Sequence, residues 1–204
     1  MLGKTHMVVG MACGLAVMQP DSVPMLVAGT GAAALGALIP DIDVGTSQSH
    51  KDANIIVYMS IAVVALVALA ERFLHLDIYN RLLAHKGLVN ILIPSVLFII
   101  ICAFGKEQPH RSFMHSILAL VLLTGCLWYL FPTLSVYFAI GFASHIITDL
   151  FNRKKVRLLY PLPGGVALGL FHAHGTANTV LFVIGSIATV ASLVFCMGNI
   201  LRII

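Results

Sequence analysis

The chain is poor in charged residues. Only 10% of its 204 residues are Asp, Glu, Lys or Arg, whereas 59% are apolar, and the mean hydropathy is +0.99. A soluble domain has about a quarter charged residues, which help it to cover a surface that faces water. This shortage excludes an ordinary water-soluble domain, and it predicts that lipid surrounds much of the chain.

Neither a cleavable leader nor paired cysteines are expected. The first apolar run contains His6 and has no clear cleavage site, which favours its retention as mature structure. No CxxC pair is present, so a disulfide framework or zinc knuckle is not expected. The cysteines all lie in apolar runs, where they are expected to pack as small apolar residues: Cys13, Cys102, Cys126 and Cys196.

The net charge is only +4, and one basic cluster is present, Arg153-Lys154-Lys155-Val156-Arg157. Nucleic-acid-binding segments commonly interleave basic and aromatic residues, and this cluster contains no aromatic residue. In a membrane protein it indicates instead a cytoplasmic loop near anionic lipid. No nucleic-acid partner is therefore expected.

Apolar segments make up most of the chain. A membrane-spanning helix needs about 20 apolar residues, and six segments reach or approach this length: residues 23–39, 54–70, 88–104, 113–131, 134–151 and 178–201, with a shorter one at about 6–18. Backbone exposed to lipid must satisfy its own hydrogen bonds, so each segment is expected to be an α-helix. The prediction is an all-α, polytopic membrane bundle of about six to seven membrane-embedded helices, with residues 1–204 as a single domain.

A count of how often the apolar segments cross the membrane places most of the conspicuous ionisable residues on one membrane face. If the chain starts on that face and each segment crosses or returns, the residues there are His6, Asp41, Asp43, His110, His115, His145 and Asp149. His145 and Asp149 are four residues apart and so share one face of a helix. Ionisable groups beside a membrane segment are costly and usually functional. His and Asp suit divalent metals without any thiolate, with Zn expected and Mn or Fe as alternatives.

Each residue alone also has a structural interpretation. Asp41 fits a Pro-Asp turn, and Asp149 is one helical turn from Arg153, with which it can pair. Solvation in a loop would account for His50, His172 and His174. These interpretations leave unexplained why three His/Asp groups from separate segments converge on one face.

The three groups lie in motifs that resemble those of a known family. The segments are Pro40-Asp41-Ile42-Asp43, His110-Arg111-Ser112-Phe113-Met114-His115-Ser116 and Ser144-His145-Ile146-Ile147-Thr148-Asp149. In this order they are similar to the PDxDH, HRGxTHS and SHxxxD motifs of the YdjM-like family, and His6 also matches its pattern. The resemblance runs from residue 1 to about residue 180. The differences are Val44, where the family often has His, Ser112 and Met114 in place of Gly and Thr, and a 175–179 segment without the Glu that many members carry, for which His172 or His174 is a possible substitute.

The resemblance implies a membrane-bound, metal-dependent hydrolase of a bacterial-type inner membrane, in a family of which some members are regulated by LexA. The family is placed in a superfamily with zinc-dependent phospholipase C and single-strand nucleases. This placement implies phosphoester hydrolysis at the membrane face, with a membrane lipid or another phosphoester as substrate. The expected ligands are His6, His110, His115, His145 and Asp149, with Asp41 and Asp43 as further ligands or as base and orienting group. Arg111 is expected either to hold a phosphate through two parallel hydrogen bonds or to anchor a helix end at the interface.

Two other functions fit the same residues. A transporter or a proton or metal-ion relay would need polar groups through the depth of the bilayer, whereas the middle of each segment is nearly pure Leu, Val, Ile and Ala. A non-catalytic scaffold would hold a structural metal in a closed site, while a catalytic site keeps one ligand position open.

The basic residues predict the orientation. The His/Asp face receives eight of the twelve basic residues, namely Lys4, Lys51, Lys106, Arg111, Arg153, Lys154, Lys155 and Arg157. The opposite face receives Arg72, Arg81, Lys86 and Arg202. Because basic loops stay in the cytoplasm, the His/Asp face is predicted to be cytoplasmic.

Overall fold

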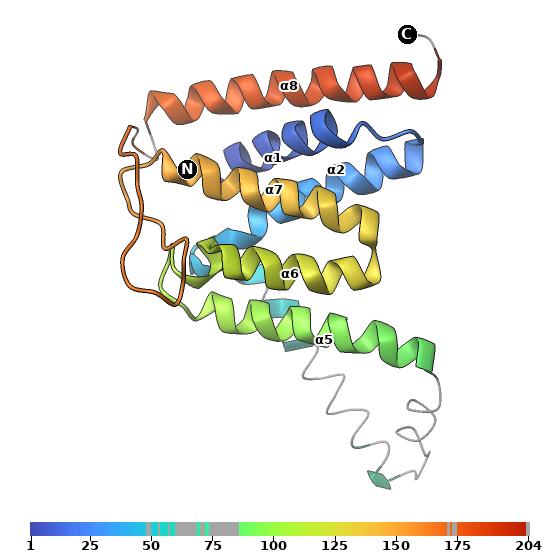
Figure 1. Ribbon diagram of the computed structural model, residues 1–204, viewed down its shortest axis with the longest axis vertical. Helices are drawn as coiled ribbons and strands as arrows, with labels where there is room; N and C mark the ends of the chain where they lie inside the picture. The colour runs from blue at the N-terminus through green and yellow to red at the C-terminus, as the bar shows by residue number, and fades with distance from the viewer. Residues whose placement is uncertain are drawn as a thin grey trace.

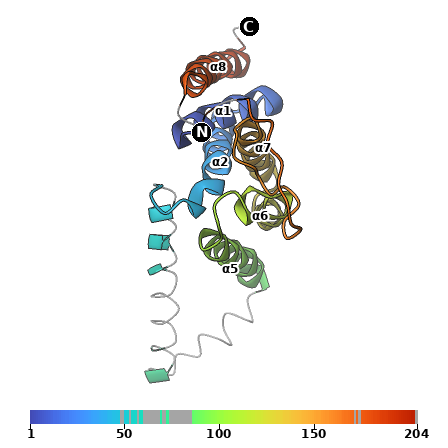
Figure 2. The same cartoon turned by 90° about the vertical axis from the view of Figure 1, so that its left-hand side faces the viewer.

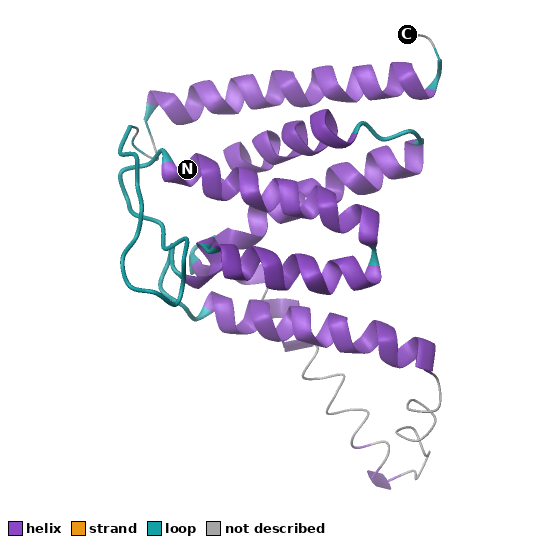
Figure 3. Ribbon diagram, viewed as in Figure 1, coloured by secondary structure: helices purple, strands orange, loops and turns teal. Residues whose placement is uncertain are grey.

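The computed structural model describes residues 1–47, 50–52, 54–56, 58–59, 69, 72–73, 86–170, 172 and 175–202. Over these residues the regular structure is helical, with no β-strand, and Val156 and Val166 form an isolated bridge (Figure 3). The α-helices are α1 (Gly3–Met18), α2 (Val23–Leu38), α5 (Lys86–Lys106), α6 (Ile117–Leu130), α7 (Pro132–Leu150) and α8 (Thr176–Ile200), and the 3-10 helices are η1 (Ile39–Asp43) and η2 (Phe113–His115). The all-α prediction is confirmed, and the segment expected at 54–70 lies mostly outside the described residues.

Local chemistry explains where the helices end. Gln19 adopts a left-handed conformation with φ of 42° and ends α1, and its N–H donates to Leu15 O. Pro132 opens α7, where a missing N–H costs nothing. The helix expected at 113–131 is split, because Ser116 is extended (ψ 158°) and its hydroxyl accepts from the N–H of Ala119, which caps α6. The residues before this cap form the separate turn η2.

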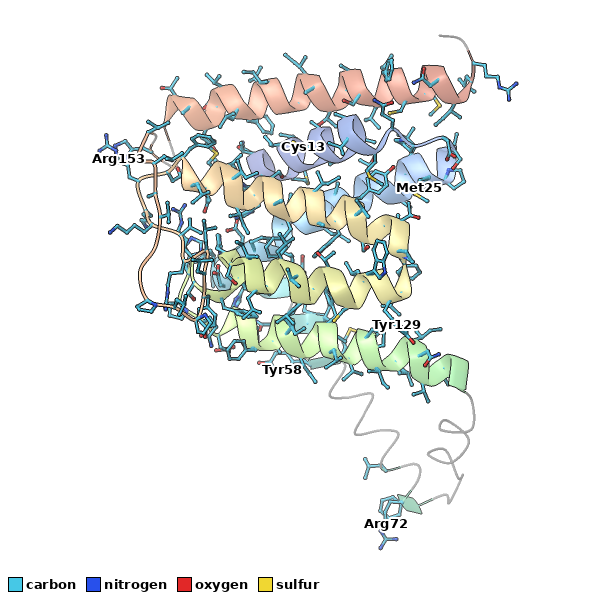
Figure 4. All side chains as sticks on the ribbon, in the orientation of Figure 1. Cys13, Met25, Tyr58, Arg72, Tyr129 and Arg153 are labelled. Atoms are coloured by element: carbon cyan, nitrogen blue, oxygen red, sulfur yellow. The ribbon has the colours of Figure 1, made fainter. Side chains whose placement is uncertain are left out.

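The helices lie side by side and run in two opposite directions, α1, α6 and α8 one way and α2, α5 and α7 the other, so that their ends gather at two ends of the bundle (Figure 1). One end, here called the motif end, holds the starts of α1, α6 and α8 and the last residues of α2, α5 and α7. The residue labels show the same division, with Arg153 at the motif end and Tyr129 at the opposite end (Figure 4). The crossing count is therefore confirmed for the described helices.

The helices have the length and apolarity of membrane spans. Four candidate spans are present within the described residues, Val23–Asp43, Gly87–Lys106, Pro132–Leu150 and Thr176–Ile200, together with the shorter apolar helices Gly3–Met18 and Ile117–Leu130. Viewed along the helices, α7 and α2 lie in the middle, and α8 and α5 form the outer layers (Figure 2). Half of the α7 window is buried, against 11% for α5 and 17% for α8, as expected if the outer helices face lipid.

Glycine residues near the motif end allow the backbones of α2 and α7 to approach closely. A Cβ on Gly141 would lie 2.0 Å from the carbonyl oxygen of Ala33, and one on Gly36 would lie 2.1 Å from that of Phe138. Such backbone contact is typical of small residues in membrane bundles. It places the last turn of α2 directly against the turn of α7 that carries His145.

Candidate metal centre

The motif end brings together the seven predicted ligand residues. They come from α1 (His6), η1 (Asp41 and Asp43), the loop before η2 and η2 itself (His110 and His115), and α7 (His145 and Asp149). They form three overlapping groups whose ligand atoms lie within 4.8 Å of one another: His6–His145–Asp149, Asp41–His115–His145 and Asp43–His110–His115. The inner members are fully buried, so any charge among them must be compensated locally.

His145 has a defined tautomer. Its Nδ1 lies 2.7 Å from the carbonyl oxygen of Ala37, on the neighbouring helix α2. A carbonyl oxygen only accepts hydrogen bonds, so Nδ1 carries the proton, and Nε2 of the neutral ring presents a lone pair. A partner that holds the other ring nitrogen in this way is the usual arrangement of a metal-binding histidine.

His6 has the same tautomer for a different reason. Its Nδ1 lies 2.9 Å from the hydroxyl oxygen of Thr148. That hydroxyl donates its one proton to backbone carbonyls of its own helix, at 2.9 and 3.0 Å, so it accepts from His6. Nε2 of His6 is left buried without a hydrogen-bond partner. The ring stacks on that of His145, with centroids 3.7 Å apart.

His115 is the third buried histidine of the cluster. Its Nδ1 lies 3.3 Å from Oδ2 of Asp43, which can only accept, and its Nε2 lies 3.2 Å from Nε2 of His145. Because the proton of His145 is on its Nδ1, Nε2 of His115 donates the hydrogen bond between these two atoms, and Nδ1 of His115 is left without a hydrogen-bond partner. When His115 instead carries its proton on Nδ1, which faces Asp43, the Nε2 lone pairs of both rings become available to a cation between them.

Two carboxylates border the same space. Oδ1 of Asp41 lies 3.7 Å from Nε2 of His145 and 3.9 Å from Nε2 of His115. Oδ2 of Asp149 lies 3.6 Å from Nε2 of His115, and its Oδ1 lies 3.5 Å from Nε2 of His6. Ligand atoms about 2.0–2.1 Å from a tetrahedral zinc ion are about 3.3 Å apart. The spacing and chemistry of these five side chains therefore fit a divalent metal.

The contacts of Asp43 differ from those of Asp41. Oδ1 of Asp43 accepts from Nδ1 of His110 at 2.8 Å, and its Oδ2 accepts from the backbone N–H of Arg111 at 3.2 Å. Asp43 thus faces the Nδ1 side of both histidines, whereas Asp41 faces Nε2 atoms. This geometry suits Asp43 to orienting the histidines and Asp41 to binding a metal, two roles that the sequence left open.

Arg111 is buried, with 6% of its surface exposed. Its Nη2 lies 2.8 Å from Oδ2 of Asp149, and its Nη1 donates to the carbonyl oxygen of Lys154 at 2.6 Å. The side chain is therefore not an interfacial anchor, and two of its nitrogens already have protein partners. This geometry indicates that Arg111 holds Asp149 in place. The spacing in the sequence also allowed Asp149 to pair with Arg153, but its partner in the structure is Arg111.

Asp149 has further partners that the sequence analysis did not single out. Nδ2 of Asn152 donates to Oδ1 of Asp149 at 2.7 Å, and the amino group of Met1 lies 3.0 Å from the same oxygen. Asn152 follows Asp149 by three residues, just beyond the end of α7, and this short separation is visible in the sequence. Thr148 is likewise adjacent in sequence, whereas the carbonyl oxygen of Ala37 carries no sequence signal at all.

The other histidines that the structure describes lie outside the cluster. Nδ1 of His50 contacts the carbonyl oxygen of Ile42, so this residue braces η1. His172 lines the adjacent cavity, and His174 lies outside the described residues. In the segment that lacks the family's Glu, Asn178 accepts from Leu2 N and Thr5 Oγ1, at 3.1 and 3.0 Å, and so ties α8 to the helix that carries His6.

A cavity of about 630 Å³ opens beside the cluster. Asp41, His110, Arg111 and Asp149 line it towards the cluster, and Arg153 and Lys154 contribute positive charge. The volume is within the range of small-molecule sites, about 300–1,000 Å³. The basic residues make the cavity suitable for an anionic ligand.

Comparison with known proteins identifies relatives of the whole chain. The model of a family described as "YdjM inner membrane protein" matches residues 1–202. The uncharacterized protein YvsG of Bacillus subtilis (strain 168) is 27% identical over 188 residues, which cover 91% of this chain and 89% of that protein. No solved structure matches the chain significantly.

Proposed function

The chain belongs to the YdjM inner membrane protein family, and we propose that it is a membrane-bound, metal-dependent hydrolase of phosphoesters. One observation carries the proposal: the buried Nε2 atoms of His6, His115 and His145 lie 3.2–3.9 Å from one another or from the carboxylate oxygens of Asp41 and Asp149. A divalent cation stabilises a buried cluster of histidine nitrogens and carboxylates at this spacing.

These five side chains would hold the metal. Histidine and carboxylate without thiolate suit Zn first, with Mn or Fe as alternatives. A divalent metal held here would supply Lewis-acid polarisation of a phosphoryl oxygen and an activated water. The family and the His/Asp cluster support metal binding, and the adjacent basic cavity supports a phosphoester as substrate.

The other residues would bind the substrate and move a proton. Arg153 and Lys154, which line the cavity, would attract the phosphate charge. His110 is the most exposed histidine of the cluster, with 37% of its side chain exposed, and Asp43 holds its Nδ1 proton. Its Nε2 is therefore placed to accept a proton at the cavity or return one to a leaving group.

The cavity also distinguishes this proposal from the alternatives. A closed structural site would need no cation-lined cavity beside it. A transporter would need ionisable groups along a path through the bilayer. Among the described residues, the buried charged and histidine side chains are all at the motif end: His6, Asp43, Arg111, His115, His145 and Asp149.

The cytoplasm is the compartment that the proposal assigns to the motif end. Lys4, Lys106 and the 153–157 cluster lie there, whereas Lys86 and Arg202 lie at the opposite end. Because this bias sets orientation, the site would face a cytoplasmic-leaflet lipid or a soluble cytoplasmic phosphoester.

The test is hydrolysis by purified protein in mild detergent. Protein stripped with chelator and reloaded with Zn, Mn or Fe is assayed with bis(p-nitrophenyl) phosphate, p-nitrophenyl phosphate and dispersed phospholipid. We expect activity that returns with metal, that His145→Ala abolishes and that the far-end control Tyr129→Phe preserves. Metal-loaded protein that hydrolyses none of these phosphoesters would refute the proposal.

A further inference from the structure

The loop beside the cavity exposes large apolar side chains. This loop, residues 153–170 and here called the strap, runs along the motif end between α7 and α8 (Figure 1). Leu159 is 64% exposed, Leu162 60%, Leu168 56% and Leu170 60%. Soluble surfaces avoid such concentrations of aliphatic groups, and a group of them marks an interaction site.

The strap is held to the bundle by backbone hydrogen bonds. Val156 and Val166 exchange two of them, at 2.8 and 2.9 Å. Arg157 N donates to Arg111 O at 3.0 Å, and Leu168 N donates to Leu150 O at 2.7 Å. The exposed leucines thus belong to a loop with defined geometry.

Side chains hold residues 157–162, here called the tip of the strap, in place. Nη2 of Arg157 donates to the carbonyl oxygens of Pro161 and Leu162, both at 3.1 Å. The ring of Tyr160 packs edge-on against Phe113, with centroids 5.5 Å apart, and Phe113 belongs to the same turn as His115. The tip is therefore braced against the element that carries a metal ligand, while Leu159 and Leu162 stay exposed.

The charge of the strap complements an anionic surface. Residues 153–170 contain four basic residues and no acidic residue. Arg153, Lys154 and Lys155 are exposed, and the first two also line the cavity. Exposed leucine beside arginine and lysine is the composition of segments that lie in the headgroup layer. Each basic residue near an anionic leaflet favours that location by about fivefold.

We propose that the strap inserts Leu159 and Leu162 into the anionic lipid leaflet at the motif end, and that the substrate is a phospholipid of that leaflet. Arg153 and Lys154 belong to both the strap and the cavity, so a lipid beside the strap has its phosphate next to the cavity. The insertion rests on the strap alone, whereas the identity of the substrate rests on the proposed hydrolase function.

Tryptophan fluorescence tests the insertion. The single tryptophan, Trp128, is replaced by Phe, and Leu162→Trp is compared with Glu107→Trp, an exposed position at the same end but outside the strap. Both proteins are placed in nanodiscs whose lipids carry bromine on the upper acyl chain. We expect Leu162→Trp to be quenched about twofold or more and to emit at shorter wavelength, more so with brominated phosphatidylglycerol than with phosphatidylcholine. Equal, unquenched emission from both positions overturns the insertion and favours a protein partner on the strap.

Substrate choice is tested separately with the double variant L159S/L162S. Phospholipid hydrolysis in nanodiscs should fall by about tenfold, because two partly inserted leucines are lost, whereas hydrolysis of soluble bis(p-nitrophenyl) phosphate should be unchanged. Unchanged phospholipid hydrolysis overturns the substrate assignment. If wild-type protein hydrolyses neither probe, the hydrolase function and this substrate assignment fail together, while the quenching result still decides the insertion.

Discussion

Replacing Asp43 with Asn tests whether this carboxylate orients the histidines. Asp43 faces N–H donors on both oxygens: Nδ1 of His110 at 2.8 Å on Oδ1, and the N–H of Arg111 at 3.2 Å on Oδ2. Nδ1 of His115 also lies 3.3 Å from Oδ2. An Asn amide has one oxygen and one NH₂ group, so in either orientation its NH₂ opposes an N–H donor. At least one histidine then loses the partner that holds its tautomer.

The size of the effect distinguishes the two roles. Loss of a partner that orients a metal-binding histidine typically weakens metal binding by about 10–100-fold, equivalent to about 1.4–2.7 kcal/mol. We expect D43N to fall in this range. Asp41 contacts Nε2 atoms directly, so Asp41→Asn removes a ligand and should weaken binding further.

Competition with a chromophoric zinc chelator, on protein in detergent, measures both affinities. Asp21→Asn provides the matched control, because it makes the same chemical change at an exposed position at the opposite end of the bundle. Affinity of D43N equal to that of the wild type, or a loss as large as that of Asp41→Asn, would refute the assignment of Asp43 as the orienting group.

Three further results are expected. His110→Gln should keep the metal but lower the hydrolysis rate by about 100-fold or more, since the proton carrier is lost; equal loss of metal would make His110 a ligand instead. Gly141→Leu, whose Cβ would lie 2.0 Å from Ala33 O, should destabilise the fold by about 3 kcal/mol or more in a denaturation assay, whereas Gly31→Leu, with open space around it, should not; similar stability of the two variants would contradict close packing of α2 against α7. A reporter within the strap should read cytoplasmic and one after Ile204 exported, and the reverse pattern would place the site outside.

The fold was largely predictable because lipid imposes simple rules. Apolar runs of about 20 residues must be helices, and alternating crossings then decide which loops share a face. The hairpin at Gln19 and the break at Pro132 were readable from turn chemistry. Hydropathy carries no information about side-chain caps. The apolar run at 113–131 therefore did not predict that Ser116 is extended and separates η2 from α6.

The composition of the cluster followed from the motifs and the crossing count, but the role of each member did not. Asp41 and Asp43 differ by two positions in one 3-10 turn, and only the turn's geometry directs one towards Nε2 atoms and the other towards Nδ1 atoms. The tautomer of His145 depends on a backbone carbonyl of another helix, to which any residue type at position 37 could contribute. Arg111 is buried and its backbone is left-handed, with φ of 65°, a conformation that the residue type does not reveal.

Elemental analysis of the purified protein is the most direct test of the metal centre. We predict that protein prepared without chelators contains at least one Zn, Mn or Fe per chain, and that His145→Ala, which removes an Nε2 shared by two of the ligand groups, loses it. Cys102→Ala, a buried change away from the ligand groups, should retain the metal. Wild-type protein that remains metal-free after incubation with each metal, or a His145→Ala variant with undiminished metal, would contradict the existence of this site.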